Sequence, residues 1–73
     1  MLRVDNVKDE EALEDVRDAL DRLGVDYRFA RAEPGEDRFP QAAYFYVPEG
    51  AVDAVENAMR ELSGEHGFDA ETL

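Results

Sequence analysis

The sequence lacks cysteine, which excludes a disulfide framework and any thiolate metal site and gives no information on the redox compartment. It is also poor in groups for catalysis, since Ser63, Thr72 and His66 are the only serine, threonine and histidine. Nucleophilic catalysis needs a hydroxyl or thiol activated by a neighbouring base, but residues 63–67 are typical of a helix end followed by a turn. We therefore interpret His66 as a solvated loop histidine and expect neither an enzyme nor a cofactor site.

Long apolar runs and basic side chains are scarce as well. The longest apolar run covers residues 42–47, whereas a membrane-spanning helix needs about 20 residues. No cationic start leads into an apolar stretch, so we expect no secretory signal and a cytoplasmic protein. Lys and Arg total 8 against 19 Asp and Glu, a formal charge of −11. This balance opposes direct binding to nucleic acid or to an anionic membrane, both of which need a surplus of cations.

With 73 residues, the chain forms one domain at most, which we place over residues 1–73. High net charge is typical of disorder when hydrophobic residues are few. Here hydrophobic residues make up 44% of the chain and aromatic residues 10%, and the apolar positions recur with regular periods. We therefore expect a folded domain.

The first third of the chain predicts a short strand and a helix. Leu2 and Val4 alternate with polar residues, which favours a strand. Asp9 is a candidate N-cap for a helix over residues 9–23, and Gly24 is placed to end it in the left-handed conformation. The apolar stripe of this helix recurs at i, i+3, i+7 and i+10 and consists of Leu13, Val16, Leu20 and Leu23.

Two strands and a turn are predicted next. Alternating Val25, Tyr27 and Phe29 favour a half-buried strand. Pro34-Gly35 fits the centre of a type II turn. Residues 41–47 are the most strand-like run, which Pro48 stops because proline has no ladder donor.

A second helix is expected over residues 50–63, ended by Gly64, followed by a weak last strand in which Phe68, Ala70 and Thr72 alternate with acids. Its stripe repeats the spacing of the first and consists of Val52, Val55, Met59 and Leu62. The order strand–helix–strand, repeated once, predicts an α+β fold of the ferredoxin-like, split βαβ type, with an antiparallel sheet and both helices on one face. If the last strand fails, a three-stranded βαββα form remains. This fold hosts many functions and identifies none.

Neighbouring acids raise the question of a metal site. Asp9, Glu10 and Glu11 are consecutive, as are Glu36 and Asp37, and carboxylates suit Mg²⁺ or Ca²⁺. No loop has the spacing of an EF-hand, and acids at a helix start usually serve capping and the helix dipole. We expect no metal site.

The aromatic run in residues 43–47 resembles the third-strand motif of RNA-recognition-motif domains, in which two rings stack on bases. Gln41-Ala42 stands where that motif has a basic residue and glycine, and the net charge opposes RNA binding. Strand alternation offers another interpretation, with Phe45 under the helices and Tyr44 and Tyr46 on the uncovered sheet face beside Arg28. Aromatic rings with arginine are typical of an interface, so we expect self-association or partner docking there.

Acidic residues predominate on the outward sides of both predicted helices. Residues four apart on a helix stand about 6 Å apart along its axis, a spacing similar to that of successive phosphates. The predicted partner is a basic protein, such as a nucleic-acid-binding protein whose groove the acids would occupy. In size and charge the chain resembles small phage-encoded inhibitors, anti-CRISPR proteins among them. The candidate partner-binding residues are Glu10, Glu14, Asp18, Asp21, Asp53, Glu56 and Glu61.

Two alternatives stay open. Lys8 is the only lysine beside seven arginines, and isoleucine is absent, a composition that resembles proteins of salt-loving organisms. The acid would then reflect habitat, in a small domain with a regulatory role. The βαββαβ order also resembles ligand-sensing ACT domains, but residues 5–8 lack the glycine with which such domains admit an amino acid.

Overall fold

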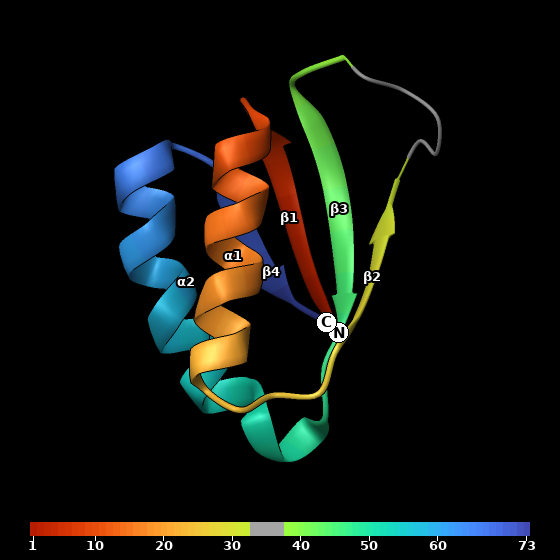
Figure 1. Cartoon of the computed structure of the whole chain (residues 1–73), viewed down its shortest axis with the longest axis vertical. Coiled ribbons are helices and arrows are strands. Elements are labelled where there is room, and N and C mark those ends of the chain that lie inside the picture. The colour runs from red at the N-terminus through yellow and green to blue at the C-terminus, as the bar shows by residue number, and fades with distance from the viewer. Residues whose placement is uncertain (33–37) are drawn as a thin grey trace.

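Six main elements follow one another in the order that the sequence predicts (Figure 1). The computed structural model describes residues 1–32 and 38–73, so the turn predicted at Pro34-Gly35 and the acidic pair Glu36 and Asp37 lie outside the described residues. A single 3₁₀ turn (Glu49–Ala51) precedes the second helix. The elements are β1 (Leu2–Val7), α1 (Glu10–Arg22), β2 (Arg28–Arg31), β3 (Gln41–Tyr46), α2 (Val52–His66) and β4 (Asp69–Thr72).

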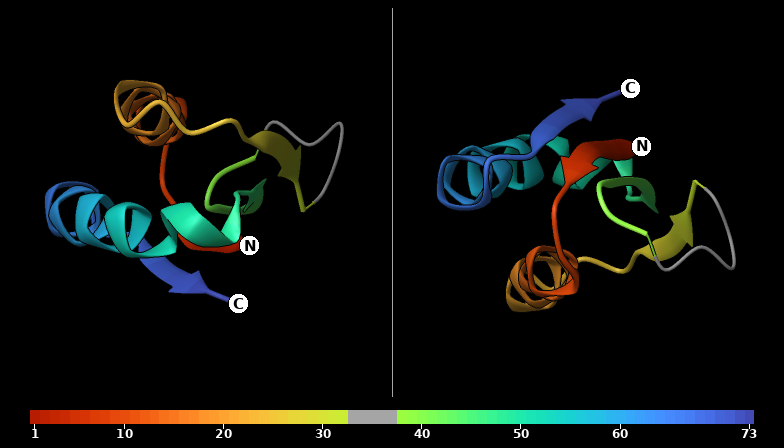
Figure 2. Two further views of the ribbon diagram at one scale, coloured as in Figure 1. Left: turned by 90° about the horizontal axis from the view of Figure 1, so that it is seen from below. Right: turned by 90° about the horizontal axis from the view of Figure 1, so that it is seen from above.

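The four strands form one sheet in the order β2-β3-β1-β4, with every neighbouring pair antiparallel. Both helices lie on the same side of this sheet, and the other side is uncovered (Figure 2). The predicted α+β, ferredoxin-like fold is thus confirmed, including its last strand. The uncovered side is called the open face below.

Both ends of α1 are built as the sequence predicts. The Asp9 side chain accepts a hydrogen bond from the backbone N–H of Ala12 at 2.9 Å, which satisfies a donor of the first turn. At the other end Gly24 has a φ of 70°. The N–H of Val25 donates to the carbonyl of Leu20 and the N–H of Gly24 to that of Asp21, both at 3.0 Å. This pair of bonds is the Schellman motif, which satisfies the last carbonyls of the helix.

The prediction that Gly64 ends the second helix is wrong. The helix continues to His66, and Gly67 ends it with a φ of 74°. The N–H of Gly67 donates to the carbonyl of Ser63 at 2.8 Å. A glycine ends a helix only where the chain needs a positive φ, and Gly64 does not adopt one. Ser63 and His66 therefore belong to the helix rather than to a turn.

These two glycines should respond to alanine in opposite directions. Gly64 has no atom within 4 Å of an added Cβ, so Gly64→Ala should stabilise the domain by about 0.5–1 kcal/mol through helix propensity. Gly67→Ala should destabilise it by about 1–2 kcal/mol, because an L side chain is strained at positive φ. Urea unfolding of both variants measures the two changes. A stabilising Gly67→Ala would place the helix end elsewhere.

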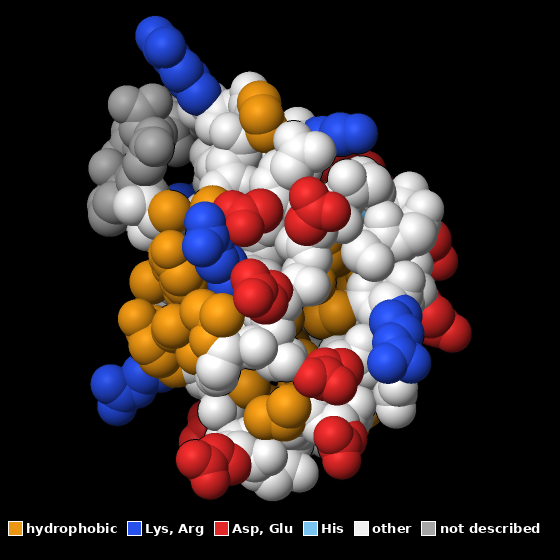
Figure 3. Space-filling model, turned by 180° about the vertical axis from the view of Figure 1, so that it is seen from behind, with side chains coloured by type: hydrophobic (Ala, Val, Ile, Leu, Met, Phe, Trp, Pro, Cys, Tyr) orange, Lys and Arg blue, Asp and Glu red, His pale blue; other side chains and the backbone are white. Residues whose placement is uncertain are grey.

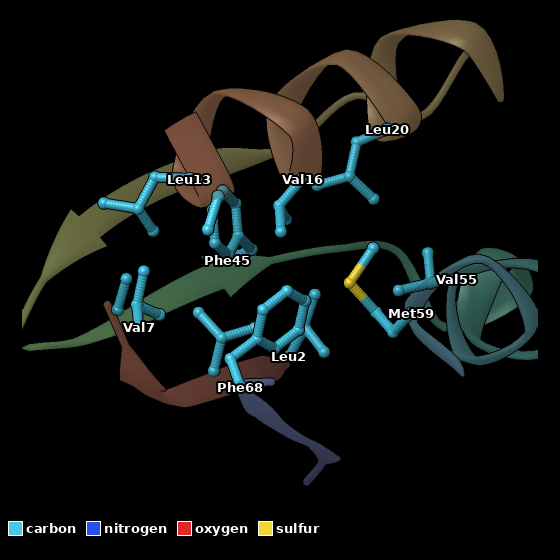
Figure 4. Packing of buried hydrophobic residues seen from close by; sticks show 12 residues of the cluster. Leu2, Val7, Leu13, Val16, Leu20, Phe45, Val55, Met59 and Phe68 are labelled. Carbon is cyan, nitrogen blue, oxygen red and sulfur yellow. The ribbon is translucent and has the colours of Figure 1, made fainter. Parts of the chain in front are cut away.

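The core lies between the sheet and the two helices, with Phe45 of β3 near its centre (Figure 4). The rings of Tyr27 and Phe29 pack on Phe45 with centroids 5.8 and 5.0 Å away. Leu23, predicted to continue the stripe of α1, is instead 43% exposed because it is the C-cap residue. The stripes otherwise supply the buried helix residues Leu13, Val16, Leu20, Val55 and Met59, while Val52 and Leu62 are half-buried.

The strand predicted from Val25 onward begins only at Arg28. The N–H of Val25 is already bonded to the end of α1. The last pair of the ladder joins Arg28 to Tyr46, and the chain after Tyr46 leaves the sheet at Pro48 for the 3₁₀ turn. Residues 25–27 therefore have no strand to pair with and serve as the connection from α1 to the sheet edge.

Candidate interaction surface

Three of the acids predicted on α1 have exposed side chains on the outer side of this helix. Glu14, Asp18 and Asp21 are exposed and, with Arg17 and Tyr27, line a shallow hollow. Burial raises the pKa of the Tyr27 phenol, and the carboxylate of Asp21 raises it further because it opposes a second negative charge. The hollow has three carboxylates against the single guanidinium of Arg17 among its lining residues, a charge balance that would attract a cationic side chain.

Glu10, predicted to face outward, is paired with arginines of the same chain, although 46% of its side chain stays exposed. Its carboxylate oxygens accept two hydrogen bonds from Arg31 at 2.8 and 3.0 Å, and Arg17 lies 3.8 Å away. Arg31 also donates to the side-chain oxygen of Gln41 at 2.6 Å. This network ties the start of α1 to β2 and β3 and occupies part of the Glu10 carboxylate, as His66 occupies part of the Asp15 carboxylate. The sequence pattern could not show it, because the closer cation, Arg31, comes from β2, 21 residues away in the chain.

Glu56 is likewise paired within the chain. It is half-buried and accepts a hydrogen bond from the hydroxyl of Thr72 at 2.5 Å, which joins α2 to the edge strand β4. Asp53 and Glu61 are exposed as predicted. Of the second acidic row, Glu56 is thus partly engaged by β4, and the two exposed members lie in the first turn and in the C-terminal half of α2.

A groove between the two helices brings acids of both together, and it encloses about 340 Å³. Half-buried Ala19, Ala58 and Leu62 line it, with Arg22 as its cation. We call it the acidic groove, after its four carboxylates from Asp15, Asp18, Glu61 and Glu65. Asp15 and Glu65 were not predicted as site residues. The available signal was their spacing, since Asp15 and Asp18 are three apart and Glu61 and Glu65 four apart, which puts each pair on one side of its helix.

The interpretation of His66 as a solvated loop residue is wrong. It is the last residue of α2, its side chain is 17% exposed, and its Nε2 lies 2.7 Å from Oδ2 of Asp15 on α1. Its ring stacks on Phe68 with the centroids 6.3 Å apart. This contact links the two helices at one of the acids of the groove. Packing against Phe68 keeps the imidazole from solvent, which no local sequence pattern indicated.

On the open face, Arg28, Tyr44 and Tyr46 lie where strand alternation predicts. Arg28 pairs in register with Tyr46, which is 53% exposed. The guanidinium of Arg3 lies over the Tyr44 ring, 5.9 Å from its centroid, and its Nε is 3.0 Å from the carboxylate of Asp5. Figure 3 views the side of the molecule away from α1, where hydrophobic side chains gather on the β2–β3 side next to acidic ones.

Residues 1–32 and 38–73 contain neither a cluster of metal ligands nor a membrane-spanning helix. No group of three or more His, Cys, Asp or Glu side chains in that part of the chain could hold a metal ion. Neither helix described there is long and apolar enough to cross a membrane.

Comparison with known proteins adds nothing to these observations. No protein-family model matches the chain, and no match is found among curated proteins or solved structures. The features of this chain that bear on function are therefore the acidic groove and the open face.

Proposed function

We propose that this chain is a non-enzymatic interaction module that binds a basic protein through the acidic groove and the acids beside it on α1. One observation carries the proposal: the two helices lie side by side and align carboxylates from both along one groove. Glu14 and Asp21 extend this surface along α1. Among the described residues that line the groove, Arg22 is the one cation. Lys and Arg side chains of a partner would meet carboxylates on two sides at once.

The same geometry supports a partner that otherwise binds nucleic acid. Carboxylates one helical turn apart are spaced by about 5–6 Å, which is close to the spacing of phosphates along a strand. A basic groove shaped for phosphates can therefore meet the two acidic helices in a comparable register. The net charge of −11 would speed association, since complementary charge steers encounter. We place this interaction in the cytoplasm, where such partners are available, with the chain acting as a nucleic-acid mimic and inhibitor.

Charge reversal in the groove tests the proposal with a defined probe. Binding of a fluorescent oligoarginine peptide is measured by anisotropy for the wild type and for Asp18→Lys with Glu61→Lys. We expect this pair to weaken binding by about tenfold or more, because it places cations on both walls of the groove. Asp26→Lys with Glu49→Lys is the matched control, since both residues are exposed outside α1 and α2 and the change in net charge is the same. Equal losses from the two pairs would mean that only total charge matters.

A second arm of this experiment addresses mimicry. Immobilised wild type should retain nucleic-acid-binding proteins that the groove variant does not retain, and added DNA or RNA should release them. Retained proteins that nucleic acid cannot displace would contradict mimicry while leaving a basic partner in place.

A high-salt habitat is the second candidate explanation, and a specific observation favours it. Exposed acids also occur away from the groove, at Glu11, Asp26, Glu49 and Asp69. In a halophile domain, such acids would repel one another at low salt, and only screening would hold the fold together. Circular dichroism measured from low salt to molar KCl distinguishes an interaction module from a halophile domain. An interaction module of an ordinary cell should stay folded throughout, whereas a halophile domain should unfold at low salt.

A further inference from the structure

The open face has an apolar end. The N–H of Leu73 donates to the carbonyl of Met1 at 2.7 Å, which extends the β1–β4 ladder by one pair. Because successive side chains of a strand point to opposite faces, the side chains of Met1 and Leu73 both lie on the open face. They belong to one row across the sheet, which Tyr46 continues on β3. Tyr46 is 53% and Leu73 62% exposed, so this row holds two of the three large hydrophobic side chains that stand exposed in the described part of the chain.

Charge is distributed unevenly across the same face. Exposed Arg28 lies on β2, at one edge of the sheet, and exposed Asp69 and Glu71 lie on β4, at the other. Between them, Arg3 and Asp5 pair with each other on β1. One edge of the face is thus basic and aromatic, and the opposite edge is acidic.

We propose that the open face is the interface of a homodimer. A two-fold axis parallel to the strands would place β2 of one protomer over β4 of its partner, because such an axis exchanges the two edges of the sheet. Such an axis keeps each position along the strands, so Arg28 then faces the acidic edge of the partner at the level of Leu73 of the partner subunit. Glu71 of the partner subunit lies one same-face step away along β4, and the same pair recurs on the other side of the axis. The tyrosines pack over the apolar row at the centre, in an aligned sheet-on-sheet arrangement with about 10 Å between the sheets.

The charge pattern favours a second copy over other occupants of this face. A uniformly basic or acidic partner would satisfy one edge and leave the other facing like charge, whereas a second copy satisfies both. The chain is also small and has no disulfide, so its core alone gives limited stability. Burying the open face in a dimer would increase the stability of the fold.

The dimer goes beyond the proposed function and does not depend on it. The open face lies on the side of the sheet away from the helices, so both acidic grooves would stay exposed on opposite outer sides of the dimer. A partner with two basic sites could then bind with a higher effective concentration than either groove alone provides.

A charge swap tests the interface. Sedimentation equilibrium in about 0.5 M KCl screens the repulsion between two chains of like net charge while affecting buried pairs less. We expect the wild type to dimerise in the micromolar range, and Arg28→Glu and Glu71→Arg each to weaken dimerisation by about tenfold. The double variant Arg28→Glu/Glu71→Arg should return to within about threefold of the wild type, because the two partners exchange places. Arg60→Glu and Glu49→Arg, on the helix side and beyond the sheet, make the same changes in net charge and should have little effect.

Two results would overturn the proposal. One is a wild type that stays monomeric up to high micromolar concentration under these conditions. The other is a double variant no better than the worse single variant, provided that circular dichroism shows all variants folded. Tyr46→Ser supplies a charge-independent check, since its exposed ring can be removed without disturbing the core, and it should also weaken the dimer.

Discussion

Val55→Asp should abolish folding. Val55 is fully buried on α2 and packs in the cluster that joins this helix to the sheet. An ionised carboxylate there would lose its hydration without a partner, a cost of several kcal/mol. A domain of this size has a total stability of about 4–11 kcal/mol at the usual value per residue. Circular dichroism should therefore show loss of helix and sheet signal together.

Ala54→Asp is the matched control for this prediction. Ala54 is the neighbouring residue on the same helix, but it is exposed. It should change stability by about 0.5 kcal/mol or less, as surface substitutions usually do. A folded Val55→Asp would mean that the face of α2 turned to the sheet has been assigned wrongly.

Leu20→Ala should cost about 2–5 kcal/mol of unfolding free energy, because it removes buried methyl groups and leaves a cavity. Leu20 is fully buried on α1, near the point where the chain turns back toward the sheet. Urea unfolding of Leu23→Ala provides the comparison, since Leu23 is the same residue type three positions later but 43% exposed. The two variants should differ by at least about 1 kcal/mol, and similar losses would contradict the assignment of the α1 stripe.

The fold was predictable from sequence because both helices and three of the strands have local signals that agree with their environment. For α1, three signals predict the same helix with the same two ends: its apolar stripe, the Asp9 cap and Gly24. The structure has this helix. The error at Gly64 shows the limit of such signals. A glycine is compatible with a helix end but does not require one, and here the chain adopts a positive φ at Gly67 rather than at Gly64.

The candidate site was less predictable, because charge pairing joins elements that are distant in sequence. A helical wheel places Glu10 and Glu56 on outer faces, but Arg31 of β2 and Thr72 of β4 bind them. Asp15 and Glu65 join the candidate site because the packing of the two helices side by side brings them into one groove. The number of acids is thus visible in the sequence, whereas the acids that remain free for a partner depend on tertiary contacts.

The most direct measurement of the proposed binding surface is a titration of the ¹⁵N-labelled chain with the oligoarginine peptide, followed by amide chemical shifts. The proposal predicts that the largest shifts fall on α1 between Asp15 and Arg22 and on α2 between Ala58 and Glu65, the two walls of the acidic groove. Amides of β1, β3 and β4 should move little. Shifts spread evenly over all exposed acids, or concentrated on the open face, would contradict the acidic groove as the binding site.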